Sequence, residues 1–183
     1  MRKVLYVLGQ LSDEDVDWLA EAGERRSVAP QEPLVREGEA IEWIFFVLDG
    51  QVVVSVSGAG ELARLGAGEI VGEMSLVDAR APSASVHAVQ PTTVLAVPKA
   101  AVLSRLERDI AFAARFYKAV ATFLSHRMRY TVQTLGYARG GEPSIDDMAS
   151  QADEVDINLL DTVSKAGARF DRLLKRVMAP ARR

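Results

Sequence analysis

The residues best suited to chemistry lie in one short stretch, 68–86, which reads GEIVGEMSLVDARAPSASV. The letters MSLV (74–77) predict a single helical turn, whose first N–H groups and dipole favour an anion. Gly72 lets the backbone approach that anion closely, and Ser83 can add a hydroxyl or an N–H group. A plainer alternative also fits these letters: Gly72 and Glu73 only make a tight turn and cap the helix.

Catalytic and metal-binding groups are sparse in the sequence. It has no cysteine and only two histidines, His87 and His126, which lie far apart. Two such histidines do not predict a metal site, and thiolate sites are excluded. No nucleophile elbow, Ser-His-Asp pattern or P-loop is visible. The sequence therefore predicts a protein that is not an enzyme and holds no metal.

Length and charge narrow the class of protein. The chain has 183 residues, a formal net charge of −3 and 49% hydrophobic residues, which predicts one domain plus an appendage. This charge gives no strong field toward nucleic acid or an acidic membrane. No apolar run reaches the roughly 18 residues of a membrane span, and the apolar part of the N-terminus is too short for a secretory signal. These features predict a soluble, cytoplasmic protein.

Strands are predicted between about residues 24 and 98. Residues 44–48 form an apolar run, and Asp49-Gly50 behind it is the strongest local signal for a hairpin. Residues 92–97 read as a further strand that Pro98 stops. Short strands with turns every 8–12 residues are typical of an antiparallel sandwich or roll.

Helices are predicted on both sides of this strand-rich part. Ser12 and Asp15 resemble a capping box ahead of a helix over 13–22, and Gly23 can close it. The C-terminal part predicts three further helices. They cover about residues 101–108, 109–135 and 157–178.

The predicted fold class is therefore α+β. It is an antiparallel, jelly-roll-like β-roll with a short N-terminal helix, a long C-terminal helix and one extra C-terminal helix. Three parts of the chain are expected. They are a domain over residues 1–135, an acidic, glycine-containing linker over 136–156, and an amphipathic helix with a basic tail over 157–183.

GxxxGEMSL followed by SASV resembles the phosphate-binding segment of the cyclic nucleotide-binding domain family, and FFVLDGQVVV resembles paired strands of its roll. The resemblance covers roughly residues 8–135. It implies a regulatory domain that binds cyclic AMP or cyclic GMP, in which Glu73 accepts hydrogen bonds from a sugar hydroxyl. The residues implied for nucleotide binding are Gly72, Glu73, Met74, Ser75, Arg80, Ser83 and Ala84.

One position departs from the family pattern. The family places an arginine on the cyclic phosphate, where a guanidinium can donate two charge-assisted hydrogen bonds. Counted from Gly72-Glu73, that position is Pro82, which has neither charge nor N–H donor. Arg80 can reach the phosphate if the loop rearranges, or it is simply solvated. The residues of the long helix that can lie over the purine, or else on a solvated face, are His126, Arg127 and Tyr130.

Two function hypotheses follow. The chain is either a cyclic-nucleotide sensor that acts through a partner, or a degenerate fold that binds no nucleotide and serves protein association. The long helix carries an apolar stripe at positions 117, 120, 124, 128, 131 and 135, whose distal half predicts a homodimer. The final helix folds back on the chain or contacts a partner protein. The 48 residues after Leu135 are too few for a winged helix-turn-helix, so DNA binding is not predicted.

Overall fold

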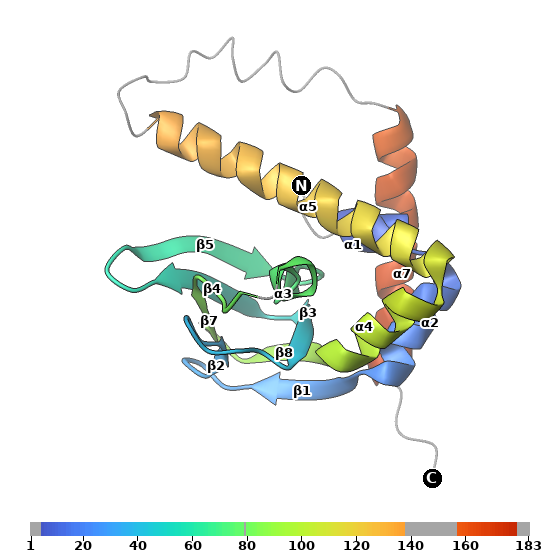
Figure 1. The fold of residues 1–183 in the computed structure, drawn as a ribbon, viewed down its shortest axis with the longest axis horizontal. Helices are drawn as coiled ribbons and strands as arrows, with labels where there is room; N and C mark the ends of the chain where they lie inside the picture. Colours follow the sequence, from blue (N-terminus) through green and yellow to red (C-terminus); the bar gives the residue numbers. More distant parts are fainter. Residues whose placement is uncertain (1–4, 79, 138–156, 179–183) are drawn as a thin grey trace.

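Two four-stranded antiparallel sheets face each other and form a roll, with the helices gathered at one side (Figure 1). The computed structural model describes residues 5–78, 80–137 and 157–178. One sheet has the strand order β1-β8-β3-β6 and the other β2-β7-β4-β5. The strands are β1 (Glu24–Val28), β2 (Pro33–Val35), β3 (Trp43–Asp49), β4 (Gln51–Val56), β5 (Gly60–Gly66), β6 (Ile70–Val71), β7 (Ser85–Ala88) and β8 (Thr92–Pro98).

The described helices surround one face of the sheet that contains β3. The predicted β-roll with a long helix and an extra C-terminal helix is confirmed, and the described residues also contain α1, which the sequence did not predict. The helices are α1 (Leu5–Gln10), α2 (Asp13–Ala22), α3 (Met74–Val77), α4 (Lys99–Arg108), α5 (Ile110–Tyr137) and α7 (Ile157–Met178). None of them is long and apolar enough, over its described residues, to cross a membrane.

The apolar run of β3 is explained by burial on both faces of its sheet. Ile44, Phe46 and Leu48 point into a core shared with the helices. Phe45 and Val47 point the other way, into a second core between the two sheets. Because successive side chains of a strand alternate between faces, a strand covered on both sides must be apolar at every position.

The predicted hairpin at Asp49-Gly50 is wrong. β3 pairs with β8 and β6, whereas β4 pairs with β5 and β7, so the turn carries the chain from one sheet to the other. A tight turn is still present, because Gly50 has a φ of +93° and a Cβ there would lie 2.5 Å from Thr92 Oγ1. A local turn signal cannot tell a hairpin from a corner between sheets.

The predicted capping box of α2 is confirmed. The Asp15 N–H donates to Ser12 Oγ and the Ser12 N–H donates to Asp15 Oδ2. Gly23 does end the helix, but its φ of −98° is an ordinary extended value. The glycine is needed for space instead, since a Cβ would lie 2.6 Å from Leu95 Cδ1.

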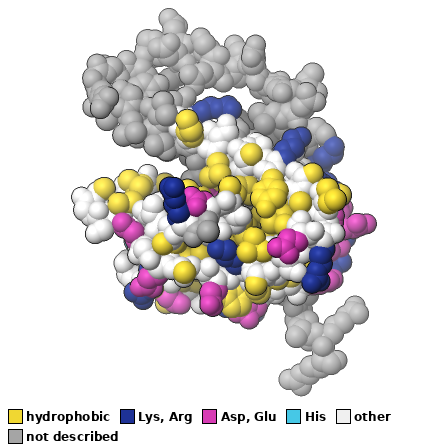
Figure 2. All heavy atoms as spheres, viewed as in Figure 1, with side chains coloured by type: hydrophobic (Ala, Val, Ile, Leu, Met, Phe, Trp, Pro, Cys, Tyr) yellow, Lys and Arg dark blue, Asp and Glu magenta, His cyan; other side chains and the backbone are white. Residues whose placement is uncertain are grey.

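Helix α5 is covered along its first half and more open beyond. Phe112, Phe116 and Val120 are buried, so Val120 belongs to the core and not to an exposed stripe as predicted. Tyr117 and Met128 remain exposed, at 44% and 70%. Figure 2 shows hydrophobic side chains gathered along this helix on the viewed face. The positions 131 and 135 of the predicted stripe have side chains outside the described residues.

Candidate functional site

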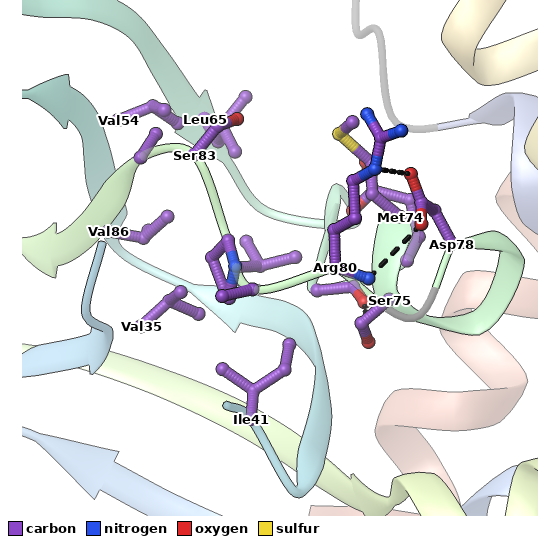
Figure 3. A pocket seen from close by; sticks show the side chains of 16 residues that line it. Val35, Ile41, Val54, Leu65, Met74, Ser75, Asp78, Arg80, Ser83 and Val86 are labelled. Carbon is purple, nitrogen blue, oxygen red and sulfur yellow. Dashed lines mark hydrogen bonds and ion pairs between the residues drawn. The ribbon is translucent and has the colours of Figure 1, made fainter. Parts of the chain in front are cut away.

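A cavity of about 240 Å³ opens beside α3, between the short helix and the inner strands of the roll (Figure 3). Its walls are largely apolar, with Val35, Val54, Leu65 and Val86 on one side. Asp78 and Arg80 line the other side, while Ser83 lies beside Val54 and Leu65. The structure places all the residues implied for nucleotide binding around this cavity, together with Pro82. They are Gly72, Glu73, Met74, Ser75, Arg80, Ser83 and Ala84.

Gly72 sets the start of the site for a backbone reason. Its φ is +92°, a conformation that side chains other than glycine rarely adopt. A Cβ on this residue would lie 2.8 Å from Ile41 Cδ1 and 3.1 Å from the carbonyl oxygen of Trp43. The glycine therefore lets the chain turn sharply from β6 into α3 against the edge of the roll.

Glu73 lines the cavity and is almost completely buried, with 2% of its surface exposed. Its backbone already has helical φ and ψ, and its side chain does not cap α3. The plain alternative of a helix cap is thus wrong for this side chain. A buried carboxylate at a cavity wall is an acceptor that can take hydrogen bonds from a ligand's hydroxyl groups.

The N-terminus of α3 offers fewer free donors than its sequence predicts. The N–H of Ser75 donates to the Gly72 carbonyl at 3.1 Å, and the N–H of Leu76 donates to the Glu73 carbonyl at 3.1 Å. The Ser75 hydroxyl also donates to the Gly72 carbonyl, at 2.7 Å. The expectation that these groups point outward to an anion is therefore wrong for Ser75 and Leu76.

The positive charge of this region points away from the cavity. Arg80 is the one cationic side chain among the described lining residues, and it is 89% exposed. Its Nε lies 3.5 Å from Asp78 Oδ2, and its backbone N–H donates to Asp78 Oδ1 at 3.1 Å. Pro82 stays where an arginine was expected, with its carbonyl accepting from the Gly38 N–H at 2.8 Å.

The sequence did not identify the apolar walls of the cavity. Val35, Val54 and Val86 lie on β2, β4 and β7, which are neighbours in one sheet in the order β2-β7-β4. All three belong to the core between the sheets. Alternation within each strand shows which residues share a face, but strand order is needed to bring them together. Asp78, the partner of Arg80, was also missed, because no motif marks this residue.

The remaining predicted residues lie elsewhere or outside the description. His87 is half-buried on β7, opposite Val53 and Pro33, and is not among the lining residues. The purine-facing candidates sit on α5, but their side chains lie outside the described residues. They are His126, Arg127 and Tyr130. Within the described ranges, no group of three or more His, Asp or Glu side chains can hold a metal ion.

A buried carboxylate connects the helices behind the site. Asp15 of α2 is fully buried and accepts hydrogen bonds from Arg115 Nε at 2.7 Å, Arg115 Nη2 at 3.0 Å and Arg105 Nη2 at 3.1 Å. Burial raises the pKa of this carboxyl, but the hydrogen bonds from Arg115 and Ser12 outweigh it and leave the pKa below its ordinary value. Asp15 thus fixes α2 against both helices that follow the roll.

The same helical core reaches the cavity. Leu76 of α3 is buried in the cluster that contains Phe112 and Phe116 of α5. The helix beside the cavity and the start of α5 therefore share one continuous core.

Comparison with known proteins agrees with this geometry. Residues 25–109 match the model of the cyclic nucleotide-binding domain. The chain is 33% identical over 102 residues to the cyclic AMP receptor protein of Thermus thermophilus, covering 54% of this chain and 47% of that protein. It is 32% identical over 97 residues to a cAMP-dependent protein kinase regulatory subunit of Debaryomyces hansenii, covering 53% of this chain and 22% of that protein. The chain thus spans less than half the length of these relatives.

Solved structures show the same fold. A cyclic nucleotide-binding domain from Methylobacillus flagellatus superposes with a TM-score of 0.65 at 24% identity, covering 78% of this chain and 85% of that one. The sequence match spans the roll from β1 to the end of α4, with the glycine-glutamate turn and the cavity inside it. By this match and by its fold, residues 25–109 of the chain are similar to the cyclic nucleotide-binding domain.

Proposed function

We propose that the chain is a ligand-sensing regulatory module, in which a cyclic nucleotide binds beside α3 and the module acts through a partner. The observation that carries this proposal is the cavity itself. It lies within the matched family domain and brings Gly72, Glu73 and Ser83 together against apolar strands. No catalytic constellation accompanies it among the described residues, which favours sensing over catalysis.

Each wall of the cavity suits one part of such a ligand. The Glu73 carboxylate can accept hydrogen bonds from a sugar hydroxyl, and the exposed Ser83 hydroxyl can donate to a phosphate oxygen. The apolar walls suit the faces of a base and a sugar ring. In this proposal Arg80 leaves Asp78 and turns toward the phosphate, because a charge-assisted hydrogen bond replaces a solvated ion pair of little net value.

The proposed output runs through α3. Leu76 packs in the same core as the first turns of α5, so a ligand that moves α3 is expected to change the packing of α5. A homodimer through the distal half of α5 would pass this change to a second copy, and Met128 at 70% exposed lies on the free part of the helix.

A second candidate function has its own observation. Pro82 stands where the family carries an arginine, and the nearest cation is 89% exposed and paired with Asp78. On this view the fold binds no nucleotide and serves only protein association. Loss of a charged hydrogen bond to phosphate costs about 1.5–3 kcal/mol, or roughly ten- to a hundredfold in affinity.

Calorimetric titration of the full chain with cyclic AMP and cyclic GMP separates the two candidates. The sensor proposal expects binding by the wild type and a loss of at least tenfold in Arg80→Ala. Arg36→Ala is the control, because Arg36 forms an exposed ion pair with Glu39 and is not itself among the lining residues. If neither nucleotide gives a heat of binding, the sensor proposal is rejected and the association module is favoured.

A further inference from the structure

We propose that α1 and α2 form a docking surface for an arginine-bearing amphipathic helix, which α7 fills within the chain and which a similar helix of a partner can occupy instead. This inference concerns a surface remote from the cavity and does not depend on nucleotide binding. In Figure 1, α7 stands beside α1 and α2, the first and last helices of the chain side by side.

The centre of the docking surface is apolar. Ala166, Phe170 and Leu173 follow one another at spacings of four and three, so they share one face of α7. Their exposed fractions are 0%, 8% and 0%. Phe170 and Leu173 belong to the same core cluster as Leu8 of α1 and Leu19 of α2. Over the described side chains of α7, this stripe therefore enters the core, and Leu174 and Val177 pack against it.

A row of charges runs along one edge of this stripe. Arg169 Nε lies 3.0 Å from Asp13 Oδ1, and Arg176 Nη1 lies 3.0 Å from Glu21 Oε1. Between them, Arg172 donates two hydrogen bonds of 2.6 Å to Asp17. The hydrogen bonds from Arg172 lower the pKa of the Asp17 carboxyl.

The spacing of these charges selects a helix. The acids of α2 recur every four residues, and the arginines of α7 recur at three and four, so an extended chain could not match them all. Arg169 Nη1 also donates to the carbonyls of Leu8, at 3.3 Å, and Gly9, at 2.9 Å, near the C-terminal end of α1. Such carbonyls have no partner within their own helix and attract a cation. The surface therefore recognises a basic amphipathic helix.

The docking surface has its own anchor, independent of α7. Asp15 fixes α2 to Arg105 and Arg115, on α4 and α5. Val16 and Leu19 of α2 are fully buried. The acidic row of α2 and its buried apolar residues can thus stay in place when α7 leaves.

The contacts of α7 are suited to exchange. Arg172 and Arg176 are each 42% exposed, and ion pairs in contact with water contribute little net stability. Because α7 belongs to the same chain as α1 and α2, its contact with them is intramolecular, and a competing helix must overcome that advantage. A partner helix with better apolar contacts can therefore compete with α7.

The test uses a labelled peptide of residues 157–178 and the full chain. Fluorescence anisotropy is expected to show weak binding to the wild type, because its own α7 fills the surface. Arg172→Glu/Arg176→Glu should release α7 and bind the peptide at least tenfold more tightly. Lys175→Glu is the control, since it reverses one charge on α7, half the change of the double variant, at a residue that has no ion pair among the described residues. It should behave as the wild type does.

A control peptide and a second variant complete the test. A peptide with both arginines changed to glutamate should not bind the double variant. If circular dichroism shows that the double variant is unfolded, Arg172→Ala replaces it and should still bind the peptide more tightly than the wild type. Equal weak binding by wild type and a folded variant, or equal binding of both peptides, would overturn the proposal.

Discussion

Asp15→Asn tests how strongly one carboxylate holds the helices together. The substitution removes the charge that Arg105 and Arg115 share, and places an amide N–H₂ group where an acceptor is needed. Breaking a buried pair typically costs about 3–5 kcal/mol. Because the Arg115 side chain is 36% exposed, water recovers part of this, and we expect a loss of about 2–3 kcal/mol in the free energy of unfolding. That corresponds to about 5–10 °C in Tm for a chain of this size.

Urea denaturation and calorimetry measure this loss, and Glu61→Gln is the control. Glu61 accepts two hydrogen bonds from Arg64, at 2.6 and 3.0 Å, much as Asp15 does from Arg115. That pair is exposed, however, with side-chain fractions of 44% and 56%. The free energy of unfolding of Glu61→Gln should therefore equal that of the wild type within error. Equal stability losses in the two variants would refute the reasoning, because burial would then not determine the value of the pair.

The other predictions concern the cavity, the helices and pH. Glu73→Gln should weaken cyclic AMP binding at least tenfold in calorimetry, since the amide accepts fewer hydrogen bonds from a sugar; unchanged affinity would remove Glu73 from the site. Pro82→Arg should raise that affinity roughly ten- to a hundredfold, and no gain would mean that another group already neutralises the phosphate. As the pH falls below about 4, α7 should lose protection in hydrogen exchange, because Asp17 has a lowered pKa when Arg172 is bound and therefore takes up a proton more readily when α7 has left; constant protection down to pH 3 would contradict this. Met128→Glu should give monomers in sedimentation if α5 forms the dimer seam, and a persistent dimer would place the seam elsewhere.

Local patterns in the sequence predicted the elements well. The capping box at Ser12 and Asp15, the single turn at 74–77 and the helix over 157–178 all depend on residues close together in the chain. The glycine-glutamate turn also identified one side of the cavity, because those residues are consecutive. Signals of this kind act through neighbouring residues and need no knowledge of the rest of the fold.

Features that depend on distant contacts could not be predicted in the same way. The turn at Asp49-Gly50 was interpreted as a hairpin, since only the pairing of β3 with β8 shows that the chain changes sheets there. The position of α7 depends on acidic residues of α2 that lie more than 150 residues earlier in the chain. Asp17, for example, accepts a hydrogen bond from Arg172.

Hydrogen exchange of the full chain with and without saturating cyclic AMP tests whether the nucleotide binds in the cavity. We expect slower exchange of the amides in residues 70–77 and 83–86, which border the cavity, because a bound ligand covers this backbone and holds α3. Unchanged exchange in both segments, or protection confined to α1 and α2, would contradict the claim that the nucleotide binds beside α3.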